Sequence, residues 1–224
     1  MTLKEVKPGS TVKVAKITGE QLNIRDLKET FDKIRNLYAN TTQSKYLWFF
    51  ASSFSFNSWK WACPACNGYG YKKVELQFLP DTYVPCDLCK GSRYKSEILD
   101  IKWKWKNIAE ILDMYISDAL QVFSEIDSIR DELQLMCDIW LWYLKMGQPA
   151  HTLSGWESQR LKLVKYLLKE FRWHTVYFLD EPTVWLHPSD IEKLLKVLEK
   201  FLEWGDTILM IEHDQNILKF DSQY

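Results

Sequence analysis

Four cysteines in two C-x-x-C pairs constrain this chain more than any other feature of its sequence. Cys63 and Cys66 form the first pair, and Cys86 and Cys89 form the second. Two such pairs at this separation are typical of four thiolates that close tetrahedrally on Zn²⁺. A closed site leaves no coordination position for chemistry, so we expect a structural zinc ion. Redox-active dithiols or unliganded cysteines are the alternatives.

Basic and aromatic residues lie beside the cysteines and favour contact with nucleic acid. The basic ones are Lys72, Lys73, Lys90 and Arg93, and Tyr69, Tyr71 and Tyr94 lie among them. Such side chains suit phosphate contacts and stacking on bases. A lysine-rich hairpin that is merely solvated is the alternative. The net charge of -1 gives no global attraction to nucleic acid or to an anionic membrane, so any basic surface must be local.

Composition predicts a folded cytoplasmic protein without a membrane partner. A hydrophobic content of 46% in 224 residues is ample for one large core or two small ones. No run approaches the roughly 20 apolar residues of a membrane span, and the first residues lack the apolar stretch of a signal peptide. In a reducing compartment, paired cysteines indicate a metal before a disulfide.

Apolar strands and amphipathic helices alternate towards the C-terminus. We expect strands over 174–180 and 206–214, each buried on both faces, with a helix over 188–204 between them. Further helices are expected over 25–39, 107–115, 117–126 and 126–147, the last ended by Gly147, and from Ser154 to about Phe171. Ser117 and Asp118 are expected to cap the helix at 117–126. This order predicts an α/β fold with a doubly wound parallel sheet.

Acidic residues close the first predicted strand in "VYFLDEP". Asp180 could enter the shell of a Mg²⁺ ion, and Glu181 could orient a water in line with a γ-phosphate. His213, at the end of the next strand, could reach the same phosphate. The preceding "LSGWESQR" resembles a helix start that faces phosphate. These three elements in this order indicate an ATPase.

Together with the cysteine module, this order resembles the UvrA family, the ABC-type ATPases of bacterial nucleotide excision repair. The matching segments are "FSFN", "CPACNGYG", "FLPDTYVPCDLCKGSRY", "NIAEILDM", "GQPAHTLSGWESQR", "VYFLDEPT", "LHPSD" and "IEHD". They extend over residues 25–220. The resemblance implies the second ATP-binding half of such a protein, with a helical signature subdomain and a Cys₄ zinc module inserted into an ABC-type nucleotide-binding domain.

The resemblance also implies roles, partners and cofactors. Asp180 matches the Walker B acid, Glu181 the catalytic glutamate and His213 the switch histidine. The residues that would contact ATP held by the opposite half are Ser154, Gly155, Glu157 and Gln159 of the signature and Gln148 of the preceding "GQ" segment. The implied partners are damaged double-stranded DNA, which the zinc module and its basic neighbours would meet, a second protomer and a UvrB-type repair protein. The implied cofactors are structural Zn²⁺ and ATP with Mg²⁺.

The chain departs from the family in lacking the phosphate-binding loop. It contains no G-x-x-x-x-G-K-[ST] and no first ATP-binding half, so we expect a fragment whose Met1 is an internal or artificial start and which alone turns over no ATP. The expected segments are 1–57, a remnant of the ATP-binding core; 58–96, the zinc insertion; 97–150, the helical signature subdomain; and 151–224, with the signature, Walker B and switch histidine.

Two other functions fit parts of this pattern. Without the phosphate-binding loop, the chain could be a non-catalytic, zinc-dependent module that binds DNA or a partner. It could also come from another ABC ATPase, such as an SMC-type protein or a transporter subunit. The resemblance disfavours this second function, because SMC-type chains insert coiled coil before the signature and transporter subunits carry no Cys₄ finger.

Tryptophan is abundant in this chain and glycine is scarce. There are 11 tryptophans and 8 glycines, whereas average usage gives about 16 glycines. The tryptophans that fall where the family has glycine are Trp48, Trp61, Trp105, Trp140, Trp156 and Trp185, with Trp59, Trp142 and Trp173 as further candidates; Trp103 falls at an aromatic position. We hypothesise that the gene reads UGA as glycine and that UGA is translated here as tryptophan. The alternative is a decayed or engineered gene with real tryptophans.

Overall fold

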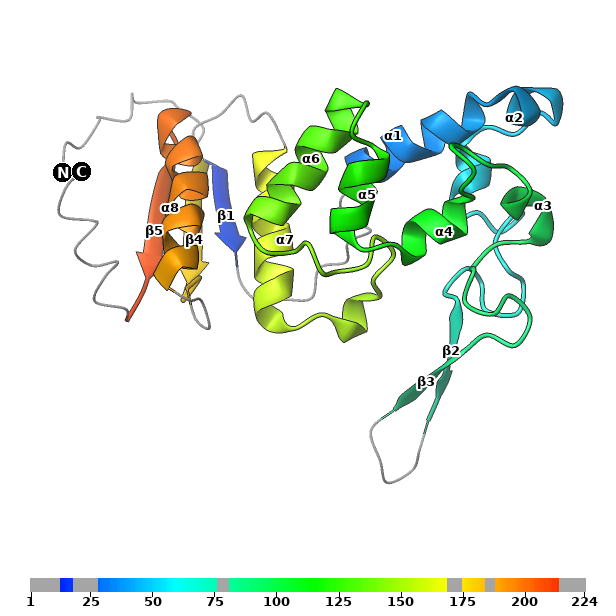
Figure 1. Ribbon diagram of the computed structural model, residues 1–224. Coiled ribbons are helices and arrows are strands. Elements are labelled where there is room, and N and C mark those ends of the chain that lie inside the picture. Colours follow the sequence, from blue (N-terminus) through cyan, green and yellow to red (C-terminus); the bar gives the residue numbers. More distant parts are fainter. Residues whose placement is uncertain (1–12, 18–27, 76–80, 169–174, 184–187, 214–224) are drawn as a thin grey trace. The chain divides into compact units, whose positions relative to one another are not determined.

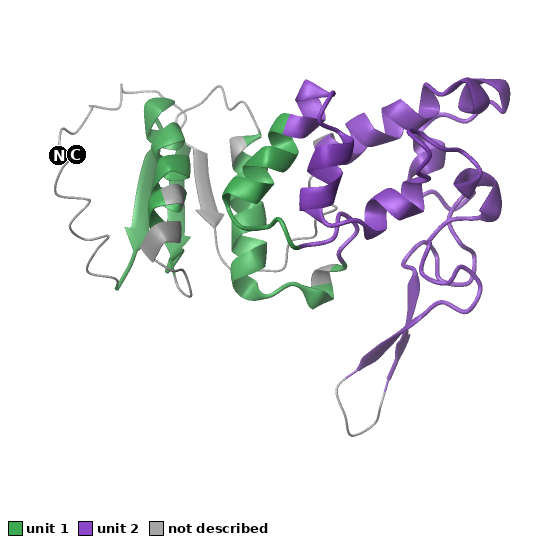
Figure 2. Ribbon diagram, viewed as in Figure 1, with its two compact units in different colours: residues 1–26, 131–143, 149–224 green, residues 27–130, 144–148 purple. Residues whose placement is uncertain are grey.

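The computed structural model describes residues 13–17, 28–75, 81–168, 175–183 and 188–213. The chain forms two compact units (Figure 2). Unit 1 comprises residues 1–26, 131–143 and 149–224, and unit 2 comprises residues 27–130 and 144–148. None of the helices among the described residues is long and apolar enough to cross a membrane.

A parallel three-stranded sheet forms the centre of unit 1 (Figure 1). Its strands are β1 (Lys13–Ile17), β4 (Thr175–Asp180) and β5 (Thr207–Ile211), in the order β1-β4-β5. Helix α8 (Pro188–Glu203) connects β4 to β5. It packs on the sheet, since the rings of Tyr177 on β4 and Phe201 on α8 lie 4.5 Å apart. The predicted parallel α/β unit is therefore confirmed.

The sequence predicted strands buried on both faces, but β4 and β5 each expose side chains on one face. On β4 buried and more open residues alternate, and Phe178 is 40% exposed. On β5, Leu209 and Ile211 are 47% and 61% exposed. The reason is that the described part of the chain supplies α8 to cover one face, while these side chains point to the other.

Two further helices begin close to the positions that the sequence predicts, but their predicted ends are not confirmed. Helix α7 (Gly155–Leu167) begins after Ser154 as expected, and its Leu161 and Val164 are buried. A short 3-10 turn, η3 (Ala150–Thr152), precedes it. The expected extension of α7 to Phe171 lies outside the described residues.

Helix α6 (Asp127–Asp138) is shorter than predicted, because it does not continue to Gly147. The chain reverses at Trp140, whose φ is 59°. Gly147 has another role: its N–H donates to the Leu112 carbonyl at 2.7 Å, and a Cβ there would lie only 2.8 Å from that oxygen. Gly147 therefore permits a close approach of two backbones and does not end the helix.

Unit 2 consists of short helices and one antiparallel hairpin. Its elements are α1 (Lys28–Ala39), α2 (Thr42–Tyr46), η2 (Ala51–Phe54), β2 (Tyr71–Val74), β3 (Thr82–Pro85), α3 (Ser96–Leu99), α4 (Ile108–Asp113) and α5 (Ile116–Val122). Its core includes the fully buried Ile34, Tyr38, Ile98 and Ile111. The predicted cap of α5 is wrong, because the Ile116 N–H donates to the Leu144 carbonyl at 2.9 Å and the helix begins before Ser117.

Candidate functional site

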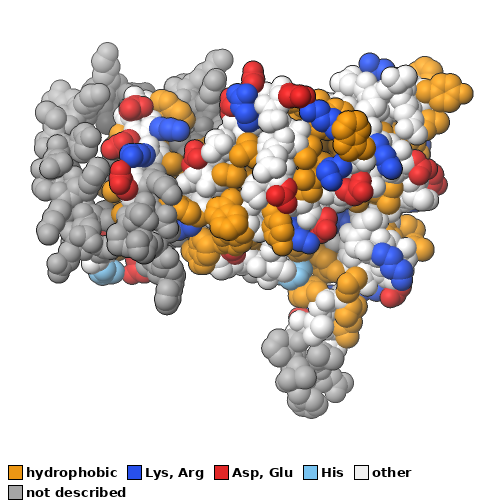
Figure 3. Space-filling model, viewed as in Figure 1, with side chains coloured by type: hydrophobic (Ala, Val, Ile, Leu, Met, Phe, Trp, Pro, Cys, Tyr) orange, Lys and Arg blue, Asp and Glu red, His pale blue; other side chains and the backbone are white. Residues whose placement is uncertain are grey.

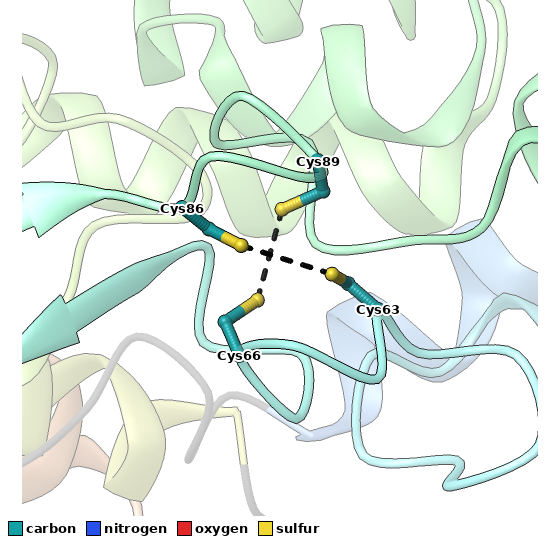
Figure 4. Close-up of side chains that lie close together, drawn as sticks. All are labelled: Cys63, Cys66, Cys86 and Cys89. Atoms are coloured by element: carbon teal, nitrogen blue, oxygen red, sulfur yellow. Dashed lines mark hydrogen bonds between the residues drawn. The ribbon is translucent and has the colours of Figure 1, made fainter.

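The four predicted cysteine ligands meet in unit 2 with their sulfur atoms pointing at one another (Figure 4). The Sγ atoms of Cys63 and Cys86 are 3.8 Å apart, and those of Cys66 and Cys89 are 3.7 Å apart. All four lie within 4.8 Å of one another. A tetrahedron with Zn–S bonds of 2.3 Å has S–S edges of about 3.8 Å. The cluster can therefore hold a metal ion, and its spacing fits zinc.

Two similar backbone turns shape the cluster. Each C-x-x-C pair is followed by two residues with positive φ: Asn67 and Gly68 after the first, Lys90 and Gly91 after the second. Only glycine fits at position 68, since a Cβ there would lie 1.9 Å from the Phe56 carbonyl oxygen. The Gly70 N–H donates to the Cys66 sulfur at 3.2 Å.

The environment of the thiols differs between ligands. Burial raises the pKa of the Cys66 thiol to about 12. Backbone N–H groups of Cys89 and Leu88 stabilise the Cys86 thiolate and lower its pKa to about 7. A bound cation would favour the thiolate at every position.

Three of the four predicted DNA contacts lie at the surface of the same unit. Lys72 and Lys73 stand on β2, paired with Asp87 and Asp81 at 2.8 Å each, and Lys90 is exposed in the turn after Cys89. Surface pairs of this kind are weak and can be exchanged for phosphate contacts. These three lysines are therefore accessible to an anionic partner.

Arg93 lies elsewhere than the sequence predicted. It is 8% exposed, and its guanidinium donates to the Gly147 carbonyl at 2.5 Å. Its own carbonyl accepts the Cys63 N–H at 2.8 Å. Arg93 thus joins the first C-x-x-C pair to the 144–148 segment, and its buried guanidinium is not presented at the surface as the three lysines are.

Aromatic side chains gather at the base of the hairpin. The rings of Tyr69 and Tyr71 lie 5.9 Å apart, and those of Tyr71 and Tyr83 lie 5.2 Å apart. Tyr83, on the exposed strand β3, was missed in the sequence because it is distant from the basic residues along the chain. Tyr94 does not belong to this group, because it is buried and its hydroxyl donates to the Phe54 carbonyl.

In unit 1 the carboxyl ends of β4 and β5 bring two predicted catalytic residues together. The Glu181 Oε1 and His213 Nε2 atoms are 3.4 Å apart, and both side chains are accessible to solvent. Glu181 has a φ of 45°, and its N–H donates to the Ile211 carbonyl at 2.9 Å. Asp180 ends β4 with its side chain exposed. The three side chains can thus face a ligand beyond the edge of the sheet.

A third carboxylate, Glu212, which the sequence pattern did not indicate, holds the turn after Glu181. Glu212 accepts both the N–H and the hydroxyl of Thr183, at 3.0 and 2.7 Å. Thr183 is 6% exposed, so these bonds are shielded from water. The position of Glu212 beside His213 in "IEHD" was a possible signal, but its partner is distant in sequence. Glu212 fixes the position of the turn that carries Glu181.

The signature residues form the capped start of α7. Glu157 accepts the Ser154 N–H at 2.7 Å and the Tyr143 hydroxyl at 2.7 Å, and the Glu157 N–H donates to the Ser154 Oγ. This reciprocal pair is a capping box. Gly155 is exposed, and apart from its chain neighbours and the backbone of its own helix no atom lies within 4 Å of where its Cβ would be. The helix start is therefore open to a partner at Gly155, whereas Glu157 is bound within the chain.

Two further signature residues contact neighbours inside unit 1. The Gln159 side-chain amide donates to the Asp180 carbonyl at 2.9 Å, which links α7 to the end of β4. The Arg160 guanidinium lies 4.5 Å from the centre of the Trp156 ring and 5.1 Å from the centre of the Trp140 ring. Gln148 belongs to unit 2, where its side-chain oxygen accepts the Lys145 N–H at 3.3 Å.

Comparison with known proteins finds close relatives over most of the chain. UvrABC system protein A of Streptococcus pyogenes serotype M1 is 49% identical over 189 residues, which are 84% of this chain and 20% of that protein. The proteins of the same name from Halalkalibacterium halodurans and Clostridium acetobutylicum are 48% and 46% identical over the same length. No protein-family model matches the chain.

A solved structure has the same fold. UvrA2 from Deinococcus radiodurans superposes with a TM-score of 0.84 at 37% identity, over 92% of this chain and 26% of that one. The chain spans 20% of the length of the curated relatives that it matches. At this identity over most of its residues, the chain belongs to the UvrA family.

Proposed function

We propose that this chain is a segment of a DNA-damage-recognition ATPase of nucleotide excision repair. In the whole protein, ATP binding and hydrolysis would control how the zinc module holds damaged duplex DNA. The observation that carries the ATPase part is the 3.4 Å approach of Glu181 to His213. It lies at the carboxyl ends of adjacent parallel strands, where open α/β sheets bind their ligands.

The roles that we propose for individual residues match those of the family, and the approach of Glu181 to His213 supports them. Asp180 takes the Mg²⁺ ion that accompanies ATP, Glu181 orients and activates the attacking water, and His213 contacts the γ-phosphate. The exposed start of α7, at Ser154 and Gly155, faces ATP held by the opposite half, with Glu157 and Gln159 keeping the helix start in position. Gln148, in the segment before the signature, is a further proposed contact to that ATP.

The same proposal leaves this chain inactive by itself. It has no G-x-x-x-x-G-K-[ST], and under this proposal a longer protein supplies the loop that cradles the phosphates. The segments 1–57, 58–96, 97–150 and 151–224 then belong to the second ATP-binding half. A second protomer and a UvrB-type repair protein are the proposed partners.

The proposed metal is Zn²⁺, bound by Cys63, Cys66, Cys86 and Cys89. Four thiolates and no open position supply no chemistry, so its role is to hold the hairpin and knuckles that carry the lysines. The tyrosines at the hairpin base would stack on bases that a lesion has displaced.

We expect the double substitution Lys72→Glu and Lys73→Glu to weaken binding of duplex DNA and reduce its salt dependence. Each lost phosphate contact lowers the slope of log K against log salt by about 1. Fluorescence anisotropy over a salt series, on the metal-loaded chain, measures this slope. Lys196→Glu on α8 is the matched control, because Lys196 forms a comparable surface pair with Glu192 at 2.9 Å. An unchanged slope in the double variant would exclude both lysines as phosphate contacts.

A non-catalytic, zinc-dependent module that binds DNA or a partner is the second candidate function. The observation that favours it is the missing phosphate-binding loop. Nucleotide binding separates the two candidates: the first predicts that Mg-ATP binds a longer protein that includes the loop, and the second predicts that ATP binds neither form.

A further inference from the structure

Among the described residues, three tryptophans have a backbone conformation that tryptophan rarely adopts. The φ angles of Trp48, Trp105 and Trp140 are 58°, 60° and 59°. In this left-handed region the Cβ of an L-residue is too close to the following carbonyl oxygen, and a bulky residue there is an outlier. Glycine has no Cβ and adopts the same angles without strain.

Two of these tryptophans end helices by the same hydrogen-bond pattern. After α2, the Phe49 N–H donates to the Ser44 carbonyl at 2.9 Å and the Trp48 N–H to the Lys45 carbonyl at 3.4 Å. After α6, the Leu141 N–H donates to Met136 and the Trp140 N–H to Cys137, both at 3.0 Å. This pair of bonds is the Schellman motif, whose left-handed position is usually glycine.

Helix α8 ends by the same motif with a glycine in place. The Asp206 N–H donates to the Phe201 carbonyl at 3.0 Å and the Gly205 N–H to the Leu202 carbonyl at 2.9 Å. Gly205 has a φ of 85°. The end of α8 therefore shows, within the same chain, that glycine suits the left-handed position of this motif.

Trp105 occupies a different motif with the same requirement. The backbones of Trp103 and Lys106 exchange two hydrogen bonds, of 2.9 and 3.1 Å, around the two-residue turn Lys104-Trp105. Lys104 also has positive φ, 44°. Positive φ at both central residues defines a type I′ turn, whose second central residue is preferentially glycine.

The indoles of Trp48 and Trp105 do little to offset this strain. They are 79% and 85% exposed. Apolar side chains, coloured orange, reach the surface on the face shown in Figure 3. Trp103, two residues before Trp105, differs in both respects: it is not among the residues with positive φ, and its ring stacks on Phe123 at 5.2 Å and 16°. The backbone conformation and the packing of the ring thus distinguish Trp105 from Trp103.

We propose that positions 48, 105 and 140 are glycine in the protein that its own cell makes, encoded by UGA, and that Trp103 is a genuine tryptophan encoded by UGG. UGA differs by one base from the tryptophan codon UGG and by one base from the glycine codon GGA. Where the cell reads UGA as glycine and the translation reads it as tryptophan, each UGA codon exchanges these two residues. The inference does not depend on the proposed ATPase function.

The consequence for the signature follows from the codon at position 156. Because one reading of UGA applies to the whole gene, Trp156 is also glycine if its codon is UGA. The indole beside Arg160 is then absent, and the helix start reads Leu-Ser-Gly-Gly-Glu. A glycine there removes the side chain that stands next to Gly155 at the exposed start of α7.

Mass spectrometry of the protein purified from its source organism tests this directly. Cleavage after glutamate releases residues 98–110, a peptide that contains both position 103 and position 105. We expect fragment ions that place tryptophan at 103 and glycine at 105. Tryptophan at both positions would overturn the proposal, and glycine at both would show that the backbone does not distinguish them. Either result is independent of any ATPase measurement.

Stability of the recombinant chain gives a second test. We expect Trp48→Gly and Trp105→Gly each to raise the melting temperature by roughly 2 to 4 °C, since each relieves left-handed strain and removes only an exposed indole. Trp103→Gly is the matched control and should lower it, because it removes a stacked ring. A lower melting temperature for Trp105→Gly would contradict the requirement for glycine.

Discussion

Removal of the metal from the four-cysteine cluster is expected to unfold the region of residues 61–95. The cysteines themselves form the local core there: Cys63, Cys66 and Cys86 are buried together with Cys89 packed against them. Strands β2 and β3 expose nearly every side chain and add little apolar burial. Structural zinc sites contribute about 10 to 16 kcal/mol of apparent binding free energy, which is folding free energy for so small a module.

Hydrogen exchange read by mass spectrometry measures this unfolding. After chelation, peptides from 61–95 should lose their protection, while peptides from α8 should keep theirs. Cys86→Ser should reproduce the loss and abolish metal binding, because Cys86 is 0% exposed and central to the cluster. Cys137→Ser, outside the cluster, is the matched control. Unchanged protection in 61–95 after complete metal removal would mean that the fold of this module does not require the ion.

The four-cysteine cluster and the residues at the carboxyl ends of β4 and β5 could be predicted from the sequence, because short patterns determine both. Two C-x-x-C pairs with glycines after them specify two similar turns, and the turns bring the sulfurs together. The ends of β4 and β5 could likewise be predicted, since parallel strands place Glu181 and His213 at one edge. The pairing of β1 with β4 could not, because residues 13–17 carry no pattern that selects a partner.

The end of α6 was missed for a reason that the structure makes clear. The apolar pattern continues past Asp138, so periodicity alone extends the helix to Gly147. The actual end depends on a left-handed residue at position 140. A glycine at that position is the usual sequence signal for a helix end, and this signal is missing because the residue is tryptophan.

Contacts between distant segments explain the other differences. Arg93 and Tyr94 lie close to the lysines in sequence, but Arg93 donates to Gly147 and Tyr94 to Phe54. Burial of this kind depends on the fold of unit 2, so it cannot be predicted from the residues next to Arg93 and Tyr94 in the sequence. The same holds for Glu212, whose partner Thr183 lies on the turn after another strand.

Replacement of Glu181 by Gln is expected to have the largest effect on function. The amide keeps the size of the side chain and removes its ability to take a proton from water. General-base catalysis contributes about 100-fold to 10,000-fold, so ATP turnover by a longer protein that includes the phosphate-binding loop should fall at least about 100-fold. Binding of ATP should persist, because Glu181 is not proposed to hold the phosphates. Glu192→Gln, an exposed change of the same kind on α8, is the matched control.

Phosphate release from Mg-ATP by this chain, by the longer protein and by its Glu181→Gln form tests the proposed function most directly. We predict no turnover by the chain alone, turnover by the longer protein, and loss of that turnover in the Glu181→Gln form. Turnover by the chain alone would contradict the proposed need for the phosphate-binding loop of a longer protein. Turnover by the longer protein that Glu181→Gln leaves unchanged would contradict the assignment of Glu181 as the catalytic base.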